Sequence, residues 1–273
     1  MKAEEFYGIL DNNLRNSKGI VIATDLIGYK NGDFYFWKIS SAKIGPKDKI
    51  ILIRAGIHGD EIAGPLTILT YADRIIDLVH RSGLKLILYP LGNPSGFEAG
   101  TRYNIDGDGG DDGNNDFLRY ASDADKWRWA SDPKLNIRLP KETELMHALL
   151  KEDRLNQVAA CIDLHQDYIS NFPPAAYHYA FGDLSRYRNI VEKIEKLVPV
   201  LRYTFISAGQ SSPAKSDAQG FIVRHDGSLQ DLMFRFGAKH SITVETSGAT
   251  PVGIARRVNL IWIYGLIELV KKE

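Results

Sequence analysis

Apolar runs alternate with amphipathic segments along the chain, which is typical of an α/β protein. Three short and mainly apolar runs, Ile50–Arg54, Leu84–Tyr89 and Val158–Leu164, have the composition of strands that are buried on both faces. Apolar residues in the segment 61–80 recur at helical spacing, so this segment predicts a helix between the first two strands. Residues 240–245 predict a further buried strand.

A hairpin and three more helices complete the predicted elements. Asn31 and Gly32 separate two β-rich runs, and Asn-Gly suits the positive φ angles of a tight hairpin turn. Residues 142–155 and 185–198 favour helices, and a last helix is predicted from about residue 253 onward. The segment 92–140 is rich in Gly, Asp, Asn and Pro and predicts a long irregular loop, which in a compact domain is usually functional.

Composition narrows the class of protein. The chain has 273 residues with 34 basic and 34 acidic side chains, so it lacks the basic excess of a nucleic-acid binder. Its single cysteine, Cys161, cannot form an intrachain disulfide. No apolar run is long enough for a signal peptide or a membrane-spanning helix, so we expect a cytoplasmic protein without a membrane or nucleic-acid partner. We predict one α/β domain over residues 1–273, with a mixed, mainly parallel, twisted sheet flanked by helices.

Two histidines and a glutamate follow predicted strands and are candidate metal ligands. His58 and Glu61 lie between a strand and a helix, and three-residue spacing at a helix start can bring both side chains to one ion. His165 follows the strand 158–164, and parallel strands of an open α/β sheet end at the same edge. A lone histidine there would more often be a core residue. Two histidines and one carboxylate leave a coordination position open for water, which is the pattern of a catalytic zinc site.

Two further residues are candidates for the chemistry of such a site. Glu245 ends the strand 240–245, where it could act as a general base, although pairing with Arg256 or Arg257 is an alternative. Arg102 lies in the long loop and could stabilise an oxyanion, or it could be an ordinary surface arginine.

Five motifs in order resemble the M14 zinc carboxypeptidase superfamily. They read H-G-D-E at 58–61, N-P-S-G-F with an arginine following at 93–102, D-G-N-N-D-F at 112–117, D-L-H at 163–165 and T-V-E-T at 243–246. The resemblance extends over roughly residues 33–270. The superfamily includes metallocarboxypeptidases, murein-peptide amidases and the succinylglutamate desuccinylase/aspartoacylase deacylases.

The resemblance implies a role for each matching residue. One zinc ion is expected at His58, Glu61 and His165, with general acid/base work at Glu245 and carbonyl polarisation at Arg102. Asp112 matches an aspartate that orients the first zinc histidine from outside the coordination sphere. Asn114 matches an asparagine that binds the terminal carboxylate of the substrate.

The chain also departs from the superfamily pattern. Asn115 stands where an arginine usually grips the substrate carboxylate, which puts ordinary C-terminal exopeptidase activity in doubt. The region about two dozen residues before Glu245 lacks the usual mobile tyrosine. Arg224 is a candidate for the missing anchor, and His225 is a candidate proton donor.

We therefore predict a zinc metallopeptidase that hydrolyses a peptide or amide bond by promoted-water attack, either carboxypeptidase-like or a peptide amidase. One alternative is an N-acyl amino-acid deacylase that resembles aspartoacylase and succinylglutamate desuccinylase. An alternative from another class is an inactive metal-binding scaffold that recognises a peptide through the loop 104–116. The expected partner is a peptide or N-acyl amino-acid substrate, and the sequence leaves the oligomeric state open.

Overall fold

The computed structural model describes residues 1–30, 32–105, 117–121, 126–206 and 214–273. Its main sheet has eight strands in the order β1-β2-β4-β3-β7-β12-β8-β11. At the centre, β3 (Ile50–Ala55) pairs in parallel with β4 (Lys85–Tyr89) and with β7 (Val158–Leu164), and β7 pairs in parallel with β12 (His240–Thr246). These are the four predicted buried strands, so the predicted mixed and mainly parallel sheet is confirmed.

Antiparallel pairs occur on both sides of this parallel centre. The predicted hairpin is β1 (Ile20–Tyr29) with β2 (Gly32–Ser41), and β2 pairs antiparallel with β4. On the other side, β8 (Ala176–Gly182) runs antiparallel to β12 and carries the short edge strand β11 (Phe221–Ile222). No element predicted from the sequence corresponds to β8.

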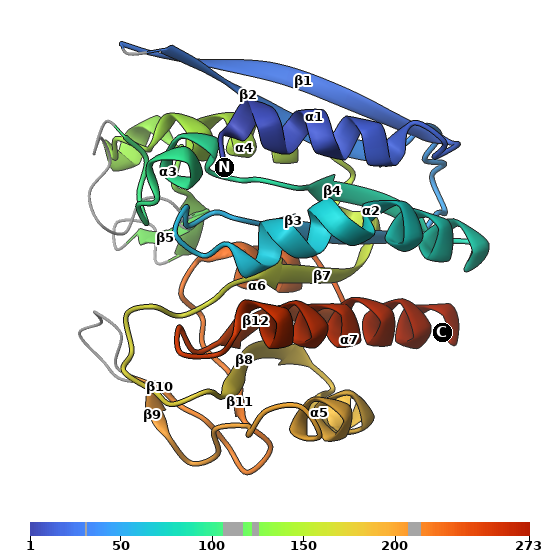
Figure 1. The fold of residues 1–273 in the computed structure, drawn as a ribbon, viewed down its shortest axis with the longest axis vertical. Coiled ribbons are helices and arrows are strands. Elements are labelled where there is room, and N and C mark those ends of the chain that lie inside the picture. The colour runs from blue at the N-terminus through green and yellow to red at the C-terminus, as the bar shows by residue number, and fades with distance from the viewer. Residues whose placement is uncertain (31, 106–116, 122–125, 207–213) are drawn as a thin grey trace.

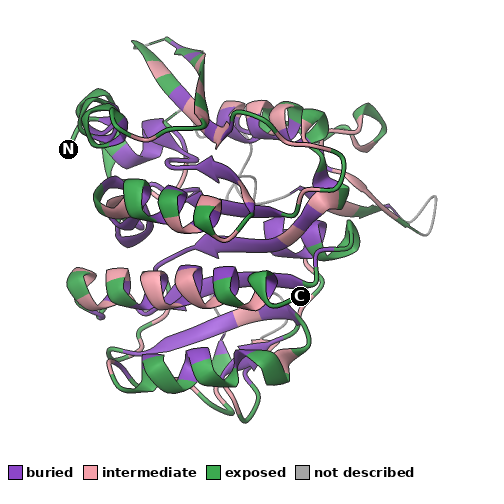
Figure 2. Ribbon diagram, turned by 90° about the vertical axis from the view of Figure 1, so that its right-hand side faces the viewer, coloured by how far each residue is buried: buried purple, intermediate pink, exposed green. Residues whose placement is uncertain are grey.

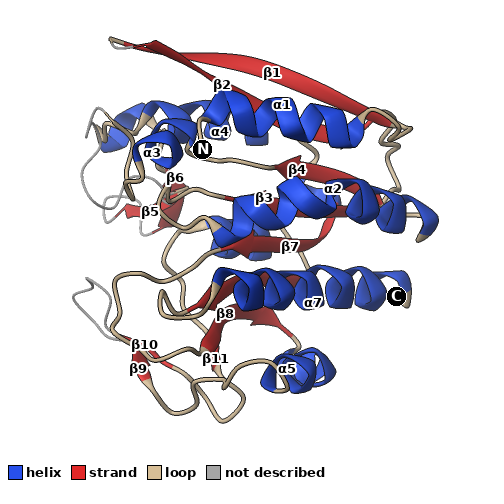
Figure 3. Ribbon diagram, in the orientation of Figure 1, coloured by secondary structure: helices blue, strands red, loops and turns tan. Residues whose placement is uncertain are grey.

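Helices cover both faces of the sheet (Figures 1 and 3). On one face lie α1 (Ala3–Leu14), α2 (Ala63–Arg81), α5 (Arg188–Glu195) and α7 (Val252–Lys271), and on the other lie α4 (Lys141–Glu152) and α6 (Leu229–Arg235). Strand alternation divides the core accordingly: Ile51 and Ile53 pack with the first group of helices, whereas Ile50 and Leu52 pack with the second. The central strands β3, β7 and β12 are therefore buried between the layers, while the helices expose their outer sides and much of the β1–β2 hairpin is exposed (Figure 2).

The segment 92–140 is more regular than predicted. It contains α3 (Pro94–Ala99), whose first turn is capped by the side chain of Asn93. A separate two-stranded sheet pairs β5 (Leu118–Ala121) with β6 (Lys126–Trp129), and a 3₁₀ turn spans Pro133–Leu135. The prediction of a wholly irregular loop is thus wrong for the described residues, because Pro94 and Pro133 each stand at the start of a short helical element, where a missing amide donor costs little.

Helix boundaries also differ from the prediction. The predicted helix 185–198 begins as a 3₁₀ turn, Leu184–Tyr187, and continues as α5. The helix α1, which no predicted element covered, buries Phe6, Leu10 and Leu14 against the first core. Its apolar residues recur at helical spacing, so the signal was present in the sequence. The remaining short elements are a 3₁₀ turn at Leu155–Gln157 and the paired strands β9 (Phe205–Ile206) and β10 (Ala214–Lys215).

None of the helices within the described ranges is both long and apolar enough to cross a membrane. The C-terminal helix α7 instead lies on the sheet, with Val258, Trp262 and Leu266 fully buried in the core.

His178 of β8 places a titratable group in this core. Its side chain is 0% exposed, and its ring centroid lies 4.8 Å from that of Trp262. Neither ring nitrogen has a hydrogen-bond partner among the described residues. Burial lowers the pKa of His178 from 6.5 to about 3, so the folded protein holds this imidazole neutral.

We predict that His178 makes the fold sensitive to acid. Below pH 6.5 the unfolded chain binds a proton at this residue that the folded chain cannot accept, so the stability falls as the pH falls through 6.5. The expected contribution of His178 to the loss between pH 7.5 and pH 5 is about 2 kcal/mol. Urea unfolding of the metal-free protein at both pH values measures it, and the loss should be smaller in the variant His178→Phe. An equal loss in both proteins would show that His178 is not responsible.

Candidate metal centre and active site

The loop between β3 and α2 carries the first two candidate ligands, His58 and Glu61. The loop packs so closely against α3 that a Cβ atom on Gly59 would lie 2.1 Å from the carbonyl carbon of Gly96. Only glycine permits this approach. The amide of Gly59 donates a hydrogen bond to the carbonyl of Arg102 at 3.1 Å, so the ligand loop and the arginine segment are held together.

The third candidate ligand, His165, and the candidate base, Glu245, come from two neighbouring parallel strands. The amide of His165 donates to the carbonyl of Val244 at 2.9 Å, which continues the ladder between β7 and β12 beyond Leu164. Glu245 is the next residue after Val244 on β12, so the sheet itself brings it close to the candidate ligand His165. The predicted location of the site at the carboxyl ends of the central strands agrees with this arrangement.

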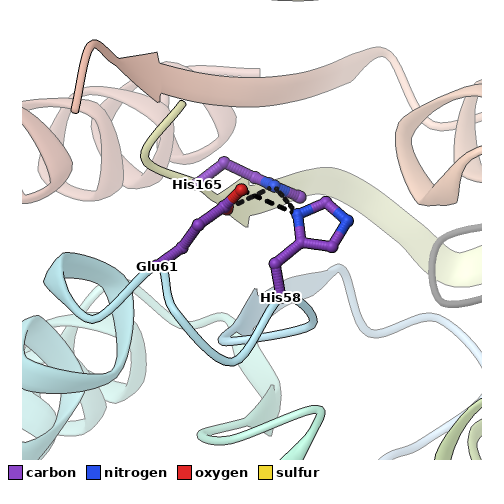
Figure 4. Close-up of side chains that lie close together, drawn as sticks. All are labelled: His58, Glu61 and His165. Carbon is purple, nitrogen blue, oxygen red and sulfur yellow. Dashed lines mark hydrogen bonds and ion pairs between the residues drawn. The ribbon is translucent and has the colours of Figure 1, made fainter. Parts of the chain in front are cut away.

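His58, Glu61 and His165 point toward one another (Figure 4). Nδ1 of His58 lies 2.8 Å from Oε1 of Glu61, and Nδ1 of His165 lies 2.8 Å from Oε2 of the same carboxylate. The two Nδ1 atoms are 3.2 Å apart. All three side chains are buried.

This donor set fits a divalent transition metal ion. Two imidazole nitrogens that face each other cannot both be acceptors without a cation or a proton between them, and a carboxylate completes the set. Their ligand atoms all lie within 4.8 Å of one another. Two histidines and one carboxylate match the ligands of catalytic zinc sites, although the same atoms bind other transition metals.

Burial and charge set the ionisation of these ligands. Burial lowers the pKa of His58 to about 4, so its imidazole is neutral and able to bind a metal ion at neutral pH. Burial acts against ionisation of Glu61, but the adjacent His58 and His165 hold the pKa of its carboxyl well below its usual range. Burial likewise opposes the charge on His165, while Asp163 and Glu61 raise its pKa well above 6.5. A metal ion at His165 would therefore compete with a proton.

Asp163 supports His165 from the side away from the metal ligands. Its Oδ2 lies 2.9 Å from Nε2 of His165, and the same carboxylate forms an ion pair with the fully buried Arg54 of β3. A hydrogen bond to the outer nitrogen of a ligating histidine fixes the ring and its tautomer. The resemblance implied such a role for Asp112 toward His58, and Asp112 lies outside the described residues.

Glu245 and Arg102 approach the same group of ligands. Oε1 of Glu245 lies 3.9 Å from Nδ1 of His165, and Nη1 of Arg102 lies 2.7 Å from Oε1 of Glu61. Burial, reinforced by the charge of Glu61, raises the pKa of Glu245 well above 4.5. Its Oε2 is buried without a hydrogen-bond partner among the described residues. The alternative was that Glu245 pairs with Arg256 or Arg257 of α7. Within the described part of the chain no such ion pair forms, and Arg256 donates a hydrogen bond to Thr70 instead.

Arg102 is anchored through its backbone as well as its side chain. Its carbonyl accepts hydrogen bonds from Gly59 and from Nδ2 of Asn93, the residue that caps α3. Burial opposes the charge of Arg102, but Glu61 raises its pKa, so the guanidinium stays charged. The structure therefore places Arg102 at the site and excludes the reading of an ordinary surface arginine.

A cavity of about 110 Å³ joins these groups to the surrounding surface. Besides the candidate ligands, Arg102 and Glu245, it is lined by side chains that the sequence analysis missed: Asp167, Ile169, Tyr177, Tyr179, Asp226, Gln230 and Thr243. Tyr177 and Tyr179 face Glu245 and Thr243 across the antiparallel pairing of β8 with β12. The aromatic residues Tyr177, Tyr179 and Phe181 alternate along the chain, which is the pattern of a strand. This pattern could have predicted β8 and the face on which Tyr177 and Tyr179 lie.

Two of the missed residues are fixed carboxylates. Asp167 accepts hydrogen bonds from the hydroxyl of Tyr177 at 2.7 Å and from the amides of Ile169 and Ser170 at 2.8 and 3.0 Å. Asp226 accepts from the amide of Ser228 at 3.0 Å, and burial raises the pKa of its carboxyl. Both side chains are thus held in place at the cavity wall.

Of the predicted substrate-binding residues, Arg224 and His225 are described, and neither lines this cavity. His225 is about half exposed, and its Nδ1 lies 2.7 Å from Oδ1 of Asp231, while its ring packs against Phe181. Arg224 lies near enough to Tyr179 and Asp226 for its charge to oppose the rise in their pKa values that burial causes. Asn114 and Asn115, together with most of the loop 104–116, lie outside the described residues, so their predicted roles stay predictions.

A sequence model of the succinylglutamate desuccinylase/aspartoacylase catalytic domain matches residues 47–217, and the chain belongs to this family. The match covers the candidate metal ligands and Arg102, whereas Glu245 lies beyond it. No curated protein sequence gives a significant match.

Several solved structures share the fold of this chain. A Shewanella baltica protein provisionally named a metallopeptidase aligns with a TM-score of 0.74 at 21% identity, covering 97% of this chain and 91% of its own. A Pseudomonas aeruginosa metallo-carboxypeptidase, solved with (2-guanidinoethylmercapto)succinic acid, aligns with a TM-score of 0.63 at 15% identity, covering 97% and 68%. Bovine thrombin-activatable fibrinolysis inhibitor, solved with tick carboxypeptidase inhibitor, gives 0.62 at 12% identity, covering 100% and 97%.

We predict that zinc stabilises the folded protein through this group. Ligand binding to the native state alone adds about 4 kcal/mol when the free ligand is a thousandfold above Kd, so the melting temperature in zinc should exceed that in EDTA by several degrees. The variant Glu61→Gln should lose most of this difference, because a neutral amide is a poor metal ligand. Differential scanning calorimetry with and without EDTA measures it.

The matched control is Asp60→Asn, which removes the neighbouring carboxylate. Asp60 is not part of the candidate ligand group, so its variant should keep the zinc-dependent increase. A similar loss in both variants would argue against Glu61 as a ligand.

Proposed function

We propose that this chain is a zinc-dependent hydrolase of a peptide or amide bond, either carboxypeptidase-like or a peptide amidase. The observation that carries the proposal is the convergence of a buried His-Glu-His group with Glu245 and Arg102 in one cavity. Membership of a hydrolytic family and the metallopeptidase fold support the same class of reaction. Zinc, when bound, would polarise the scissile carbonyl and make water a stronger nucleophile.

Glu245 is the proposed general acid and base. A carboxyl whose pKa lies well above 4.5 is a stronger base than an exposed glutamate, which suits it to take a proton from the attacking water. The Glu245 side chain lines the cavity, and its buried Oε2 has no hydrogen-bond partner among the described residues, so no described group competes for it with a water molecule or the leaving nitrogen. The proton taken from water is then delivered to the leaving amine, and Glu245 returns to its ionised form.

Arg102 is the proposed oxyanion partner. Its guanidinium stays charged, and its ion pair with Glu61 holds it beside the ligand group. Negative charge that develops on the carbonyl oxygen during attack is stabilised by a cation that is already in place. The backbone bonds of Arg102 to Gly59 and Asn93 reduce the movement needed to reach that position.

The charges of the cavity bear on the choice of substrate. Apart from the candidate metal ligands, Glu245 and Arg102, the charged side chains that line it within the described ranges are Asp167 and Asp226. Both are acidic, so an anionic group that enters this part of the cavity is repelled, whereas a neutral or cationic group is favoured. This disfavours a free carboxylate next to the scissile bond, as in an N-acyl amino acid or at a peptide C-terminus, and favours an amide bond of the kind that a peptide amidase cleaves. The family assignment keeps the deacylase as the second candidate.

The first test uses a mixed substrate pool with mass spectrometry of the products. The pool holds peptides with free C-termini, γ-linked cell-wall peptides and N-acyl amino acids, and the zinc-loaded protein is compared with its Glu245→Gln variant. Cleavage of an amide in either peptide class supports the first candidate, and cleavage of N-acyl amino acids alone supports the second. Metal binding without any cleavage supports the inactive scaffold.

We predict that Glu245→Gln lowers kcat by roughly 10²–10⁴-fold, because general acid–base catalysis contributes about that much. Zinc affinity should change little, since Glu245 is not one of the candidate ligands. The control is Glu268→Gln, the same substitution on the exposed side of α7, which should leave kcat unchanged. Full turnover by the metal-loaded Glu245→Gln variant would disprove its assignment.

We further predict that Asp226 contributes to selection by charge. In peptides that differ only in the group bound in this part of the cavity, a lysine side chain should be preferred over a glutamate side chain. Asp226→Asn should reduce the ratio of the two kcat/KM values by about tenfold, equivalent to about 1.4 kcal/mol. The exposed Asp73→Asn serves as the control for a change in net charge. An unchanged ratio in Asp226→Asn would rule out this role.

A further inference from the structure

An arginine without access to solvent lies behind the metal ligands. Arg54 of β3 is 0% exposed and stands directly opposite Asp163 of β7 in the parallel register. Arginine is rarely buried to this extent, because removing its charge from water is costly. A hydrophobic pair of similar volume would often stabilise such a position equally well, so the ion pair calls for an explanation beyond packing.

The contacts of Arg54 form a row that ends at His165. Nε of Arg54 donates to Oδ1 of Asp163 at 2.9 Å, and Nη2 donates to Oδ2. Oδ2 of Asp163 also lies 2.9 Å from Nε2 of His165. Two further contacts hold the guanidinium in place. Its Cζ lies 5.0 Å from the centroid of the Phe117 ring, and its Nη1 lies 3.7 Å from Sδ of Met146.

This row sets the orientation of the His165 ring. Both oxygens of Asp163 accept hydrogen bonds from Arg54, so the carboxylate is held in one position on the sheet. Its Oδ2 lies within hydrogen-bond distance of Nε2 of His165, which anchors that edge of the ring. Nδ1, the other ring nitrogen, then faces Glu61 and His58.

We propose that Arg54 is a positioning residue for metal binding, which acts through Asp163 to fix the ring orientation of His165. The inference rests on the proposed metal centre but concerns a residue outside the ligand group. Without Arg54, Asp163 loses the two hydrogen bonds that hold its carboxylate in place, and the ring of His165 loses a fixed partner. Nδ1 of His165 is then held less firmly toward Glu61 and His58, which weakens metal binding at that atom.

The test compares the variants Arg54→Met and Arg54→Lys with the wild-type protein. Zinc affinity is measured by competition with a chromophoric chelator, and the proton on Nε2 of His165 is followed by NMR of zinc-loaded, ¹⁵N-histidine-labelled protein. Arg54→Met should weaken zinc binding by roughly 10–100-fold, and the Nε2 proton should exchange faster with water. Arg54→Lys keeps the charge but lacks the two-pronged contact, so its zinc affinity should fall between those of the other two proteins.

The control is Ile53→Val, a buried change on the same strand that points to the opposite face of the sheet. It should lower the melting temperature of the metal-free protein while leaving zinc affinity within about twofold, which separates a general loss of stability from the proposed effect. If Arg54→Met cannot be obtained folded, Arg54→Lys decides the matter alone.

Wild-type zinc affinity in both arginine variants would overturn the proposal, and wild-type affinity in Arg54→Lys would overturn the part that depends on the two-pronged contact. These readouts do not depend on turnover. A wild-type protein that binds zinc but cleaves no amide would therefore refute the proposed function and leave the role of Arg54 intact. A wild-type protein that binds no zinc would refute both.

Discussion

A carboxylate without access to water has to be compensated inside the protein, and the site is arranged around one such group. Glu61 is 2% exposed, and its two oxygens are approached by His58, His165, Arg102 and the amide of Gln166. These partners come from three separate segments, which are the β3–α2 loop, the segment after α3 and the end of β7. Satisfying the charge of Glu61 therefore fixes the relative positions of all three, and the same contacts gather the candidate ligands of a metal ion.

Buried polar groups behind Glu61 and its partners compensate one another in the same way and extend into the core. Asp163 and Arg54 neutralise each other on adjacent strands, while Asn93 and Gly59 hold the backbone of Arg102. Buried polar groups that are fully satisfied make a region rigid, because each alternative arrangement would leave a donor or acceptor without a partner. The proposed chemistry thus relies on groups whose positions are set before any substrate arrives, which is the condition for effective electrostatic stabilisation of a transition state.

Much of this site could be predicted from the sequence because its main parts follow local patterns. Each central strand is an apolar run, and His58, His165 and Glu245 stand at the ends of such runs, so the edge where parallel strands finish brings them together. The substrate side of the cavity could not be predicted in this way. Tyr179 and Asp226 reach the cavity through the antiparallel strand β8 and the turn before α6, and their position depends on tertiary pairing rather than on spacing along the chain.

The position of β8 has a consequence for how proteins of this fold can diverge. The proposed ligands and base are carried by parallel strands whose side chains are tied into one network, whereas Tyr177 and Tyr179 project from a strand that joins the sheet from the opposite direction. Substitutions on β8 can alter the shape and charge of the cavity without disturbing the ladder between β7 and β12. The residues that recognise the substrate can therefore change during evolution independently of the residues that carry out the reaction. A lineage can in this way acquire new substrates while its reaction stays the same.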